Sequence, residues 1–358
     1  MIVPFPLTNQ LYSQVIREEF THEYNMYELV DLNGTKIFEN ATVSNCIPFV
    51  RKERYKGETI ISKINTNFQI QRAFTQPYEK LVQDEVKYVW NVSENKRDLE
   101  RFSHMHKLGD YCYISKGMCL FDEDGTFKKT DLLSPTKDSI HCKEYVEGKS
   151  IEKYNVKNIR YLEYGTDRSP GKLSRPTFPE LYTTPKIVFN ILGHIVGTYD
   201  DTGLMHNNSL NACVLWNKLS GVDNKSITMS INRYSNYQRN ELEELSRRVD
   251  ILYLLGVMNS KCMDYVLALL RGDDYHIYPE HVRNIPIPSA TVEEQQKVIK
   301  KVNTILEKKK KDSSSNTSSL ESEIDRIVYH LYGLTYDEVL IIDPTPPFTQ
   351  EEYEQDNL

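Results

Sequence analysis

The hydrophobic pattern of this 358-residue chain changes its period part-way along, and that change limits the folds open to it. Residues 106–240 are rich in Tyr, Gly and Pro and hold short alternating runs such as Tyr111–Ile114, a pattern typical of β-strands joined by long loops. From residue 241 the apolar positions fall three and four apart, as at Leu242, Leu245 and Val249. The sequence therefore predicts an α+β fold with a β-rich middle followed by helices.

Capping residues place the starts of several of these helices. A Thr with a Glu three residues later forms a capping box at Thr291 and again at Thr335, and Asn259-Ser260 precedes another apolar run. A polar hinge of lysines and serines covers 308–319, and an amphipathic helix follows to Gly333. The Pro-rich, acidic tail after Asp343 is predicted to be disordered.

The first hundred residues have a different character. Residues 1–55 show short apolar runs of strand length and one helical stretch, and the apolar start at Ile2–Pro4 is expected to belong to a larger sheet. Residues 56–105 are polar and weakly patterned, which predicts a connecting region with some helix.

Bulk properties favour a cytoplasmic protein. No apolar run approaches the length of a membrane span, and the N-terminus has neither the basic start nor the cleavage site of a signal peptide. Six scattered cysteines without a C-x-x-C pair indicate reduced thiols.

Net charge argues mildly against a nucleic-acid partner, since it is −7 and affinity for DNA comes largely from Lys and Arg. The test is local, however, because what matters is a basic face. Residues 165–179 form a long basic segment without helical period, and tyrosines are interleaved with basic groups on both sides of it. Composition alone leaves a DNA-binding surface and an ordinary Tyr-rich β surface about equally favoured. The candidate DNA contacts are Arg168, Lys172, Arg175, Lys186, Arg233, Tyr237 and Arg239.

Motifs that would carry chemistry are weak. Methylation of adenine needs an Asn- or Asp-Pro-Pro-aromatic turn, and the nearest string, residues 345–348, begins with Thr. No glycine loop for a nucleotide or S-adenosylmethionine follows a strand. We therefore predict no catalytic and no cofactor-binding residue on this chain.

Two metal-site patterns are also weak. The triplet at residues 147–149, with Asp138 upstream, matches the Glu-x-Lys end of a metal-dependent nuclease motif. Glu-x-Lys triplets such as Glu147 with Lys149 are, however, frequent by chance. A zinc site can be drawn through His104, His106, Cys112 and Cys119, but its spacing fits no common pattern. No metal ligand is predicted.

A series of strings in a fixed order is more informative. KEYVEGKSIEKYNVKNIR (143–160) precedes TTPKIVFNILG (183–193) and VGTYDDTGLMHNNSL (196–210). These are followed by YLLGVMNSKCMDYVLALLRG (253–272) and YPEHVRNIPIPSATVEEQQKVI (278–299). This order resembles the TaqI-like specificity domain of adenine-specific DNA methyltransferases, which also underlies type IIG restriction-modification enzymes and the methyltransferases of phage-exclusion systems. Residues 2–20 and 27–52 are similar to the end of the catalytic lobe of those enzymes, and 319–343 to their closing helices.

The resemblance implies a division of the chain and a function. Residues 1–55 would be the end of a methyltransferase lobe, 56–105 a connection, 106–290 the target-recognition domain, 291–343 closing helices and 344–358 a disordered tail. The chain would recognise double-stranded DNA by sequence while a catalytic lobe, on the same or another chain, holds S-adenosylmethionine and methylates a flipped adenine. The family's cofactor loop and catalytic turn precede anything equivalent to Ile2, so this chain alone is expected neither to methylate nor to cleave DNA.

Two alternatives stay open at this stage. The string at 285–299 also resembles specificity subunits of type I restriction systems, which carry two recognition domains and two long helices, whereas one recognition domain is predicted here. A self-sufficient nuclease would need a metal-binding carboxylate cluster, for which Glu147 and Lys149 are the candidates.

Overall fold

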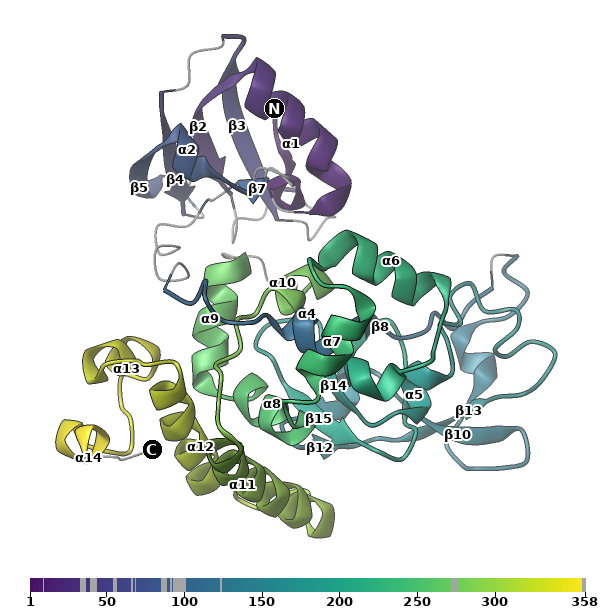
Figure 1. Ribbon diagram of the computed structural model, residues 1–358. Coiled ribbons are helices and arrows are strands. Elements are labelled where there is room, and N and C mark those ends of the chain that lie inside the picture. The colour runs from purple at the N-terminus through teal and green to yellow at the C-terminus, as the bar shows by residue number, and fades with distance from the viewer. Residues whose placement is uncertain are drawn as a thin grey trace. The chain divides into compact units, whose positions relative to one another are not determined.

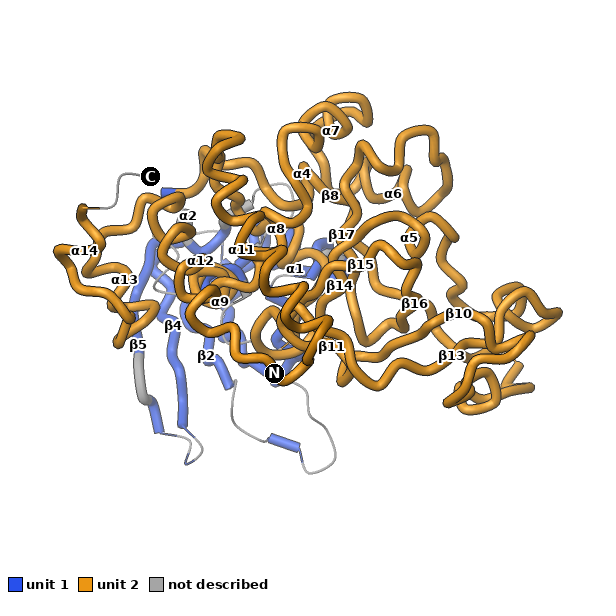
Figure 2. The backbone as a smooth tube through the Cα atoms, turned by 90° about the horizontal axis from the view of Figure 1, so that it is seen from below, with its two compact units in different colours: residues 1–101, 268–275 blue, residues 102–267, 276–358 orange. Residues whose placement is uncertain are grey.

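The computed structural model places the chain in two units (Figures 1 and 2), unit 1 comprising residues 1–101 and 268–275 and unit 2 residues 102–267 and 276–358. It describes residues 1–8, 10–32, 37–38, 44–53, 57–65, 67, 69–84, 89–90, 92, 101–122, 124–271 and 276–355. Among these residues, no helix is long and apolar enough to cross a membrane. All six cysteines are free thiols.

Unit 1 is built on a five-stranded mixed sheet of order β1-β3-β2-β4-β5. β2 and β4 are parallel and the other neighbours are antiparallel. Its apolar core includes Phe5, Leu29 and Ile61. The elements are β1 (Val3–Pro4), α1 (Gln14–Glu23), β2 (Asn25–Asp31), β3 (Asn45–Arg51), β4 (Glu58–Ile64), β5 (Ile70–Pro77), α2 (Tyr78–Leu81), β6 (Val82–Asp84) and β7 (Val89–Trp90), with short 3₁₀ turns over Phe5–Thr8 and Leu11–Ser13.

This unit corrects one sequence expectation. β4 and β5, predicted to lie in a connecting region with some helix, are strands of the same sheet as β1–β3. The residues of β4 show no apolar alternation, because Ile61 is buried together with the polar Thr59 and Ser62, while Ile60 is exposed. A strand of this composition gives no clear signal in the sequence.

Unit 2 contains two four-stranded sheets around one large core. The first, of order β15-β14-β17-β8, is antiparallel throughout. The second has the order β16-β10-β13-β9, with β10 and β16 parallel. Their strands are β8 (Cys112–Lys116), β9 (Leu133–Ser134), β10 (His141–Val146), β13 (Arg160–Glu163), β14 (Lys186–Asn190), β15 (Gly197–Asp200), β16 (Met205–His206) and β17 (Leu210–Leu215), and β11 (Ile151–Glu152) and β12 (Asn155–Val156) form a small hairpin.

Helices complete unit 2 from residue 225 onward. They are α6 (Lys225–Tyr234), α7 (Arg239–Ser246), α8 (Ile251–Met258), α9 (Lys261–Arg271, whose last residues belong to unit 1), α10 (Pro279–Arg283), α11 (Val292–Lys311), α12 (Ser318–Leu331), α13 (Tyr336–Ile342) and α14 (Gln350–Glu354). Those after residue 241 were predicted by the change in period, whereas α6 lies in the stretch that was expected to be β-rich. Shorter turns are α4 (Leu108–Tyr111), α5 (Glu180–Thr183) and 3₁₀ helices at Lys129–Leu132, Gly148–Ser150 and Trp216–Leu219. The fold class is α+β, as predicted.

Close packing of α8 on α11 depends on one glycine. A Cβ built on Gly256 would lie 2.4 Å from Cγ1 of Val298 and 3.2 Å from Cγ2 of Val302, so no larger residue fits without moving α11. The capping boxes predicted at Thr291 and Thr335 are both present, with each Thr hydroxyl accepting from the Glu amide three residues on.

The expectation of a disordered tail is wrong for residues 344–355. Thr349 caps α14, and Tyr353 donates a 2.9 Å hydrogen bond to the carbonyl of Leu334. Phe348 stacks on Tyr353 with ring centroids 5.6 Å apart. The two aromatic rings, in an otherwise polar and proline-rich segment, supply the burial that composition alone hid.

Candidate functional site

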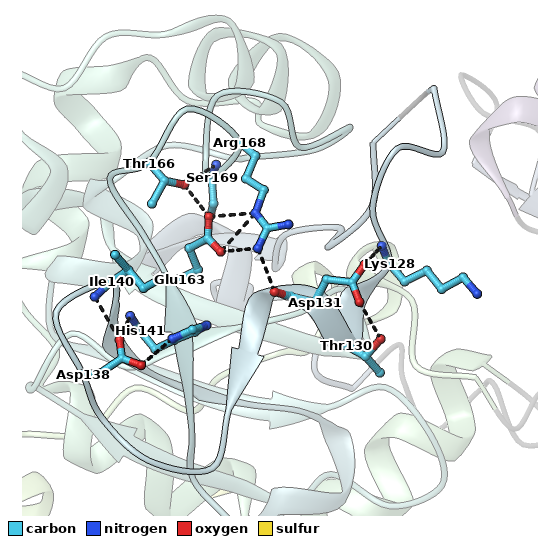
Figure 3. Close-up of polar contacts among 10 residues, drawn as sticks. All are labelled: Lys128, Thr130, Asp131, Asp138, Ile140, His141, Glu163, Thr166, Arg168 and Ser169. Carbon is cyan, nitrogen blue, oxygen red and sulfur yellow. Dashed lines mark hydrogen bonds and ion pairs between the residues drawn. The ribbon is translucent and has the colours of Figure 1, made fainter.

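The basic segment 165–179 forms a loop without helix or strand, as predicted, and Glu163 at the end of β13 anchors it. The guanidinium of Arg168 donates from Nε at 2.9 Å and from Nη2 at 2.6 Å to the two carboxylate oxygens (Figure 3). Nη2 also donates to the carbonyl of Asp131 at 2.9 Å, and the hydroxyl of Thr166 donates to Glu163 at 2.6 Å. Arg168 therefore ties the loop to β13 and to the 129–132 turn.

The lowered pKa of the Glu163 carboxyl group agrees with this anchoring role of Arg168. The Arg168 hydrogen bonds hold the pKa of Glu163 below its usual range, although partial burial opposes the shift. Glu163 is 3% exposed and the Arg168 side chain 39%. Because Glu163 already neutralises the charge of Arg168, this arginine attracts an anion less strongly than an arginine without an ion-pair partner would.

The rest of the loop carries exposed charge. Lys172 is exposed, and its side chain has no partner among the described residues. Arg175 is also exposed, and its main-chain carbonyl accepts from Cys119 at 3.0 Å, which fixes its place beside β8. Its Nη2 lies 3.5 Å from the hydroxyl of Ser115, which makes this a weak hydrogen bond. No carboxylate in the described part of the chain compensates Arg175.

Arg175 belongs to a group of positive charges that we call the basic cluster, made of Lys116, Arg175 and Arg283. Lys116 ends β8, and burial together with the charge of Arg175 lowers its pKa. Arg283, at the end of α10, donates to the carbonyl of Ile114 at 2.5 Å, and burial lowers its pKa. Glu280 is the carboxylate that opposes both shifts.

Aromatic rings border the basic cluster. Lys116 lies 5.7 Å from the ring centroid of Tyr278, and Arg283 stands over the ring of Tyr234 at 4.1 Å. The exposed Arg233 is the chain neighbour of Tyr234 at the end of α6. The basic cluster holds three cations, and Glu280 is the nearby carboxylate. This excess of positive charge attracts an anion, while the aromatic faces interact favourably with the cations.

Three other candidates are placed differently from the expectation. Lys186 is fully buried, forms an ion pair with Asp200 and donates to the carbonyl of Tyr182 at 2.6 Å, so its ammonium is not available at the surface. Arg239 is bonded to Glu243 at 2.7 Å and to the carbonyl of Leu219 at 2.5 Å. We leave both out of the proposed interface.

Tyr237 is half-buried and packs against the core of unit 2. Its hydroxyl lies 3.4 Å from Nδ1 of His106. This tyrosine is therefore held from two sides, and its contact with DNA stays a prediction.

Sequence reasoning missed Lys116 and Arg283. Lys116 closes an alternating strand, where a polar residue is unremarkable, and Arg283 lies in the string PEHVRNIP, more than a hundred residues away. Only the packing of α10 on β8 brings them together. The sequence does give one indication for Arg283, because it lies in residues 278–299, one of the strings that resemble the TaqI-like specificity domain.

The weak metal patterns find no support in the described residues, where no three His, Cys, Asp or Glu side chains gather as a metal site would require. Glu147 instead accepts from Lys129 at 2.8 Å and from Arg160 at 2.9 Å. A carboxylate already shared by two cations is a poor ligand for a divalent metal.

Comparison with known proteins finds similarity in structure alone, since no protein-family model matches the chain and no curated protein does. The chain is similar to the structure of the type IIL restriction-modification enzyme MmeI in complex with DNA, at 10% identity and a TM-score of 0.49, over 94% of this chain and 47% of that one. It is similar to the type IIG restriction endonuclease BpuSI, at 14% identity and a TM-score of 0.32, over 92% of this chain and 46% of that one.

A third similar structure is the HsdS subunit from Thermoanaerobacter tengcongensis, at 11% identity and a TM-score of 0.30, over 67% of this chain and 52% of that one. The chain thus spans about half the length of these structures.

Proposed function

We propose that this chain recognises double-stranded DNA as the target-recognition part of an adenine-specific DNA methyltransferase, in a restriction-modification or phage-defence system in the cytoplasm. Unit 2 would hold the duplex, while a catalytic lobe binds S-adenosylmethionine and methylates the flipped base. That lobe would be part of the same protein or a separate chain. The order of the strings between residues 143 and 299 supports this assignment.

The observation that carries the proposal is the basic cluster. In a chain of net charge −7, Lys116, Arg175 and Arg283 converge from β8, the 165–179 loop and α10, with Glu280 as the opposing carboxylate. Cations that outnumber the one carboxylate beside them, and that secondary structure positions, suit phosphate contacts. Arg233 lies with Arg283 near Tyr234, and Lys172 is exposed on the same loop as Arg175. We call the basic cluster together with these two residues the basic surface.

Unit 1 supports the proposed partner lobe. Among the described residues, β1 is a two-residue edge strand that pairs with β3 alone, through Val3 and Cys46. An open edge of this kind can accept a further strand. We propose that the catalytic lobe extends the sheet there, which is consistent with the similarity of residues 2–52 to the end of that lobe.

A type I specificity subunit remains the second candidate in rank. Such subunits carry two recognition domains, and unit 2 has one pair of four-stranded sheets among the described residues. No observation favours this alternative over the first proposal.

Duplex binding tests the proposal directly. Fluorescence anisotropy with a labelled duplex pool at several salt concentrations should show binding that weakens as salt rises. The variant Arg175→Gln/Lys172→Gln/Arg233→Gln should bind weakly and lower the salt slope by about one for each lost phosphate contact. Lys310→Gln, at an exposed lysine on α11 outside the basic surface, is the matched control. Equal affinity and slope in a folded triple variant would remove the basic surface from the interface.

A further inference from the structure

A hollow of about 840 Å³ lies at the end of β10, within unit 2 and formed by none of the basic-cluster residues. Its walls come from the 148–150 turn, residues 158–160, the end of β14 at 190–192, and the β16–β17 turn at Asn207 and Ser209. The size is within the range of pockets that hold small organic ligands.

Charged groups gather around one carboxylate in this hollow. Glu147 accepts from Lys129 and Arg160, from the hydroxyl of Tyr145 at 3.3 Å and from Nδ2 of Asn207 at 3.4 Å. Lys149 also lines the hollow, is exposed, and has no side-chain partner among the described residues. Lys129, Lys149 and Arg160 line the hollow with three positive charges, and Glu147 adds one negative charge. The lining therefore has an excess of two positive charges and attracts anions.

The polar wall is rigid. The hydroxyl of Ser209 accepts from the amide of Gly148 at 2.9 Å and donates to Oδ1 of Asn207 at 2.5 Å. Asn207 then reaches Glu147, so the turn after β16 and the turn after β10 are bonded to one another. Groups fixed in this way lose little freedom when a ligand binds.

Part of the lining is aliphatic and reaches water. Ile159 is 38% exposed and Leu192 is 44% exposed, and Ile191 and Pro135 also line the hollow. Asn158, at a φ of 54°, turns the chain immediately before Ile159. Exposed branched aliphatic side chains in the lining of a charged hollow favour a ligand that carries a flat apolar face as well as an anionic group.

From this combination we propose that the hollow binds a nucleoside monophosphate unit, with its phosphate at Lys129, Lys149 and Arg160 and its base against Ile159 and Leu192. The shared chemistry has two sources, a free nucleotide or a nucleotide of bound DNA. This proposal stands apart from DNA binding by the basic cluster, because the two sets of residues do not overlap.

Calorimetric titration of the full chain with each of the four deoxynucleoside monophosphates is the test. Saturable binding is expected, with deoxyadenosine and inorganic phosphate each at least about tenfold weaker than the matching nucleotide, since each makes half of the contacts. Lys149→Gln should weaken nucleotide binding roughly tenfold, because it removes a charge-assisted contact without disturbing an internal bond. Ile159→Asp should abolish the binding.

Controls separate this proposal from the previous one. Lys137→Gln, at an exposed lysine outside the hollow, and Arg175→Gln should leave nucleotide affinity unchanged. If duplex DNA competes with the nucleotide, the occupant is a nucleotide of DNA, and if it does not, the occupant is a free nucleotide. Absence of saturable binding at millimolar concentrations, or binding that survives both Lys149→Gln and Ile159→Asp, overturns the proposal whatever the duplex experiments show.

Discussion

Two neighbouring regions of unit 2 differ in whether a carboxylate neutralises the charge of a basic side chain. On β14, Lys186 is 0% exposed and lies against Asp200 of β15, so its charge is matched. On the loop that precedes it, Arg175 is exposed and faces Lys116, where the charges repel. Both residues were predicted to contact DNA because both lie in the same basic, aromatic stretch of sequence.

The difference shows what charge in a sequence leaves undecided. A cation becomes part of the scaffold when the fold brings it a carboxylate that no other cation shares, as Asp200 does for Lys186 and Glu163 for Arg168. It stays available for a ligand when the fold brings another cation. This difference can be tested by measuring how much each charged residue contributes to the free energy of unfolding. The largest effect is expected for the buried Lys186–Asp200 pair and the smallest for the basic cluster.

The largest expected effect follows removal of Lys186. Burial alone would raise the pKa of Asp200, but the charge and hydrogen bond of Lys186 lower it. Lys186→Met leaves this carboxylate buried without its counter-charge, which costs about 3–5 kcal/mol in comparable cases. We expect the low end, since Asp200 keeps the amides of Thr202 and Leu204. Urea unfolding measures the loss.

A double variant separates the pair from general damage. Lys186→Met/Asp200→Asn should recover part of the stability, because it removes the unmatched charge. Lys172→Met, on the exposed loop, should change stability by no more than about 0.5 kcal/mol. Equal losses for Lys186→Met and Lys172→Met would contradict the comparison.

A buried carboxylate on α12 supplies the second effect, with the opposite sign. Burial raises the pKa of Asp325 to about 6, against the amide of Lys261 and the charges of Lys153 and Lys261. Its unfolded pKa is about 3.9, so the native state binds the proton more tightly. This contribution to stability is complete below about pH 4 and is lost as the pH rises through 6.

Asp325→Asn should therefore stabilise the protein at pH 7.5, by at most about 3 kcal/mol, and hardly at all at pH 4. The asparagine oxygen can still accept the 2.8 Å bond from Lys261. Melting temperatures at both pH values give the comparison. A variant less stable than the parent at pH 7.5 would mean that the carboxylate is needed as an ion-pair partner.

Sequence reasoning worked best where local rules decide the structure. The caps at Thr291 and Thr335, the helices after residue 241 and the absence of regular structure in 165–179 all follow from short-range chemistry, and the structure has them. It failed where a distant partner decides. β4 and β5 become strands by pairing with a sheet whose other members lie earlier in the chain, and residues 344–355 are ordered by contacts of Tyr353 with Leu334.

The candidate site shows the same limit. The sequence suggested Arg175 and Arg233, which the structure leaves exposed, together with Lys186 and Arg239, which the structure pairs with Asp200 and Glu243. These two acids cannot be told from other acids without the fold. It missed Lys116 and Arg283, because no short-range pattern distinguishes a lysine at the end of a strand from any exposed lysine.

A third effect, of intermediate size, is expected at the base of the loop. Arg168→Ala leaves Glu163 with Thr166 but without its two guanidinium bonds, and should cost about 1.5 kcal/mol. Since Arg168 lowers the pKa of Glu163, the pair stabilises the fold above pH about 4.3, and that contribution is lost as the pH falls through the lowered value. The difference in stability between parent and variant should therefore shrink below pH 4, as acid titration of both proteins can show.

The smallest effect on stability is expected for Arg175→Gln. Arg175 has no carboxylate partner among the residues that the structure describes, and its charge helps to lower the pKa of Lys116. Its removal relieves repulsion, so unfolding free energy should stay within about 0.5 kcal/mol of the parent or rise slightly at low salt. The pKa of Lys116, followed by NMR of its side chain, should move up towards its usual range. Duplex affinity should nevertheless fall. If Arg175→Gln destabilised the fold as much as Arg168→Ala, Arg175 would be a scaffold residue, and the distinction between matched and unmatched charges would no longer locate the interface.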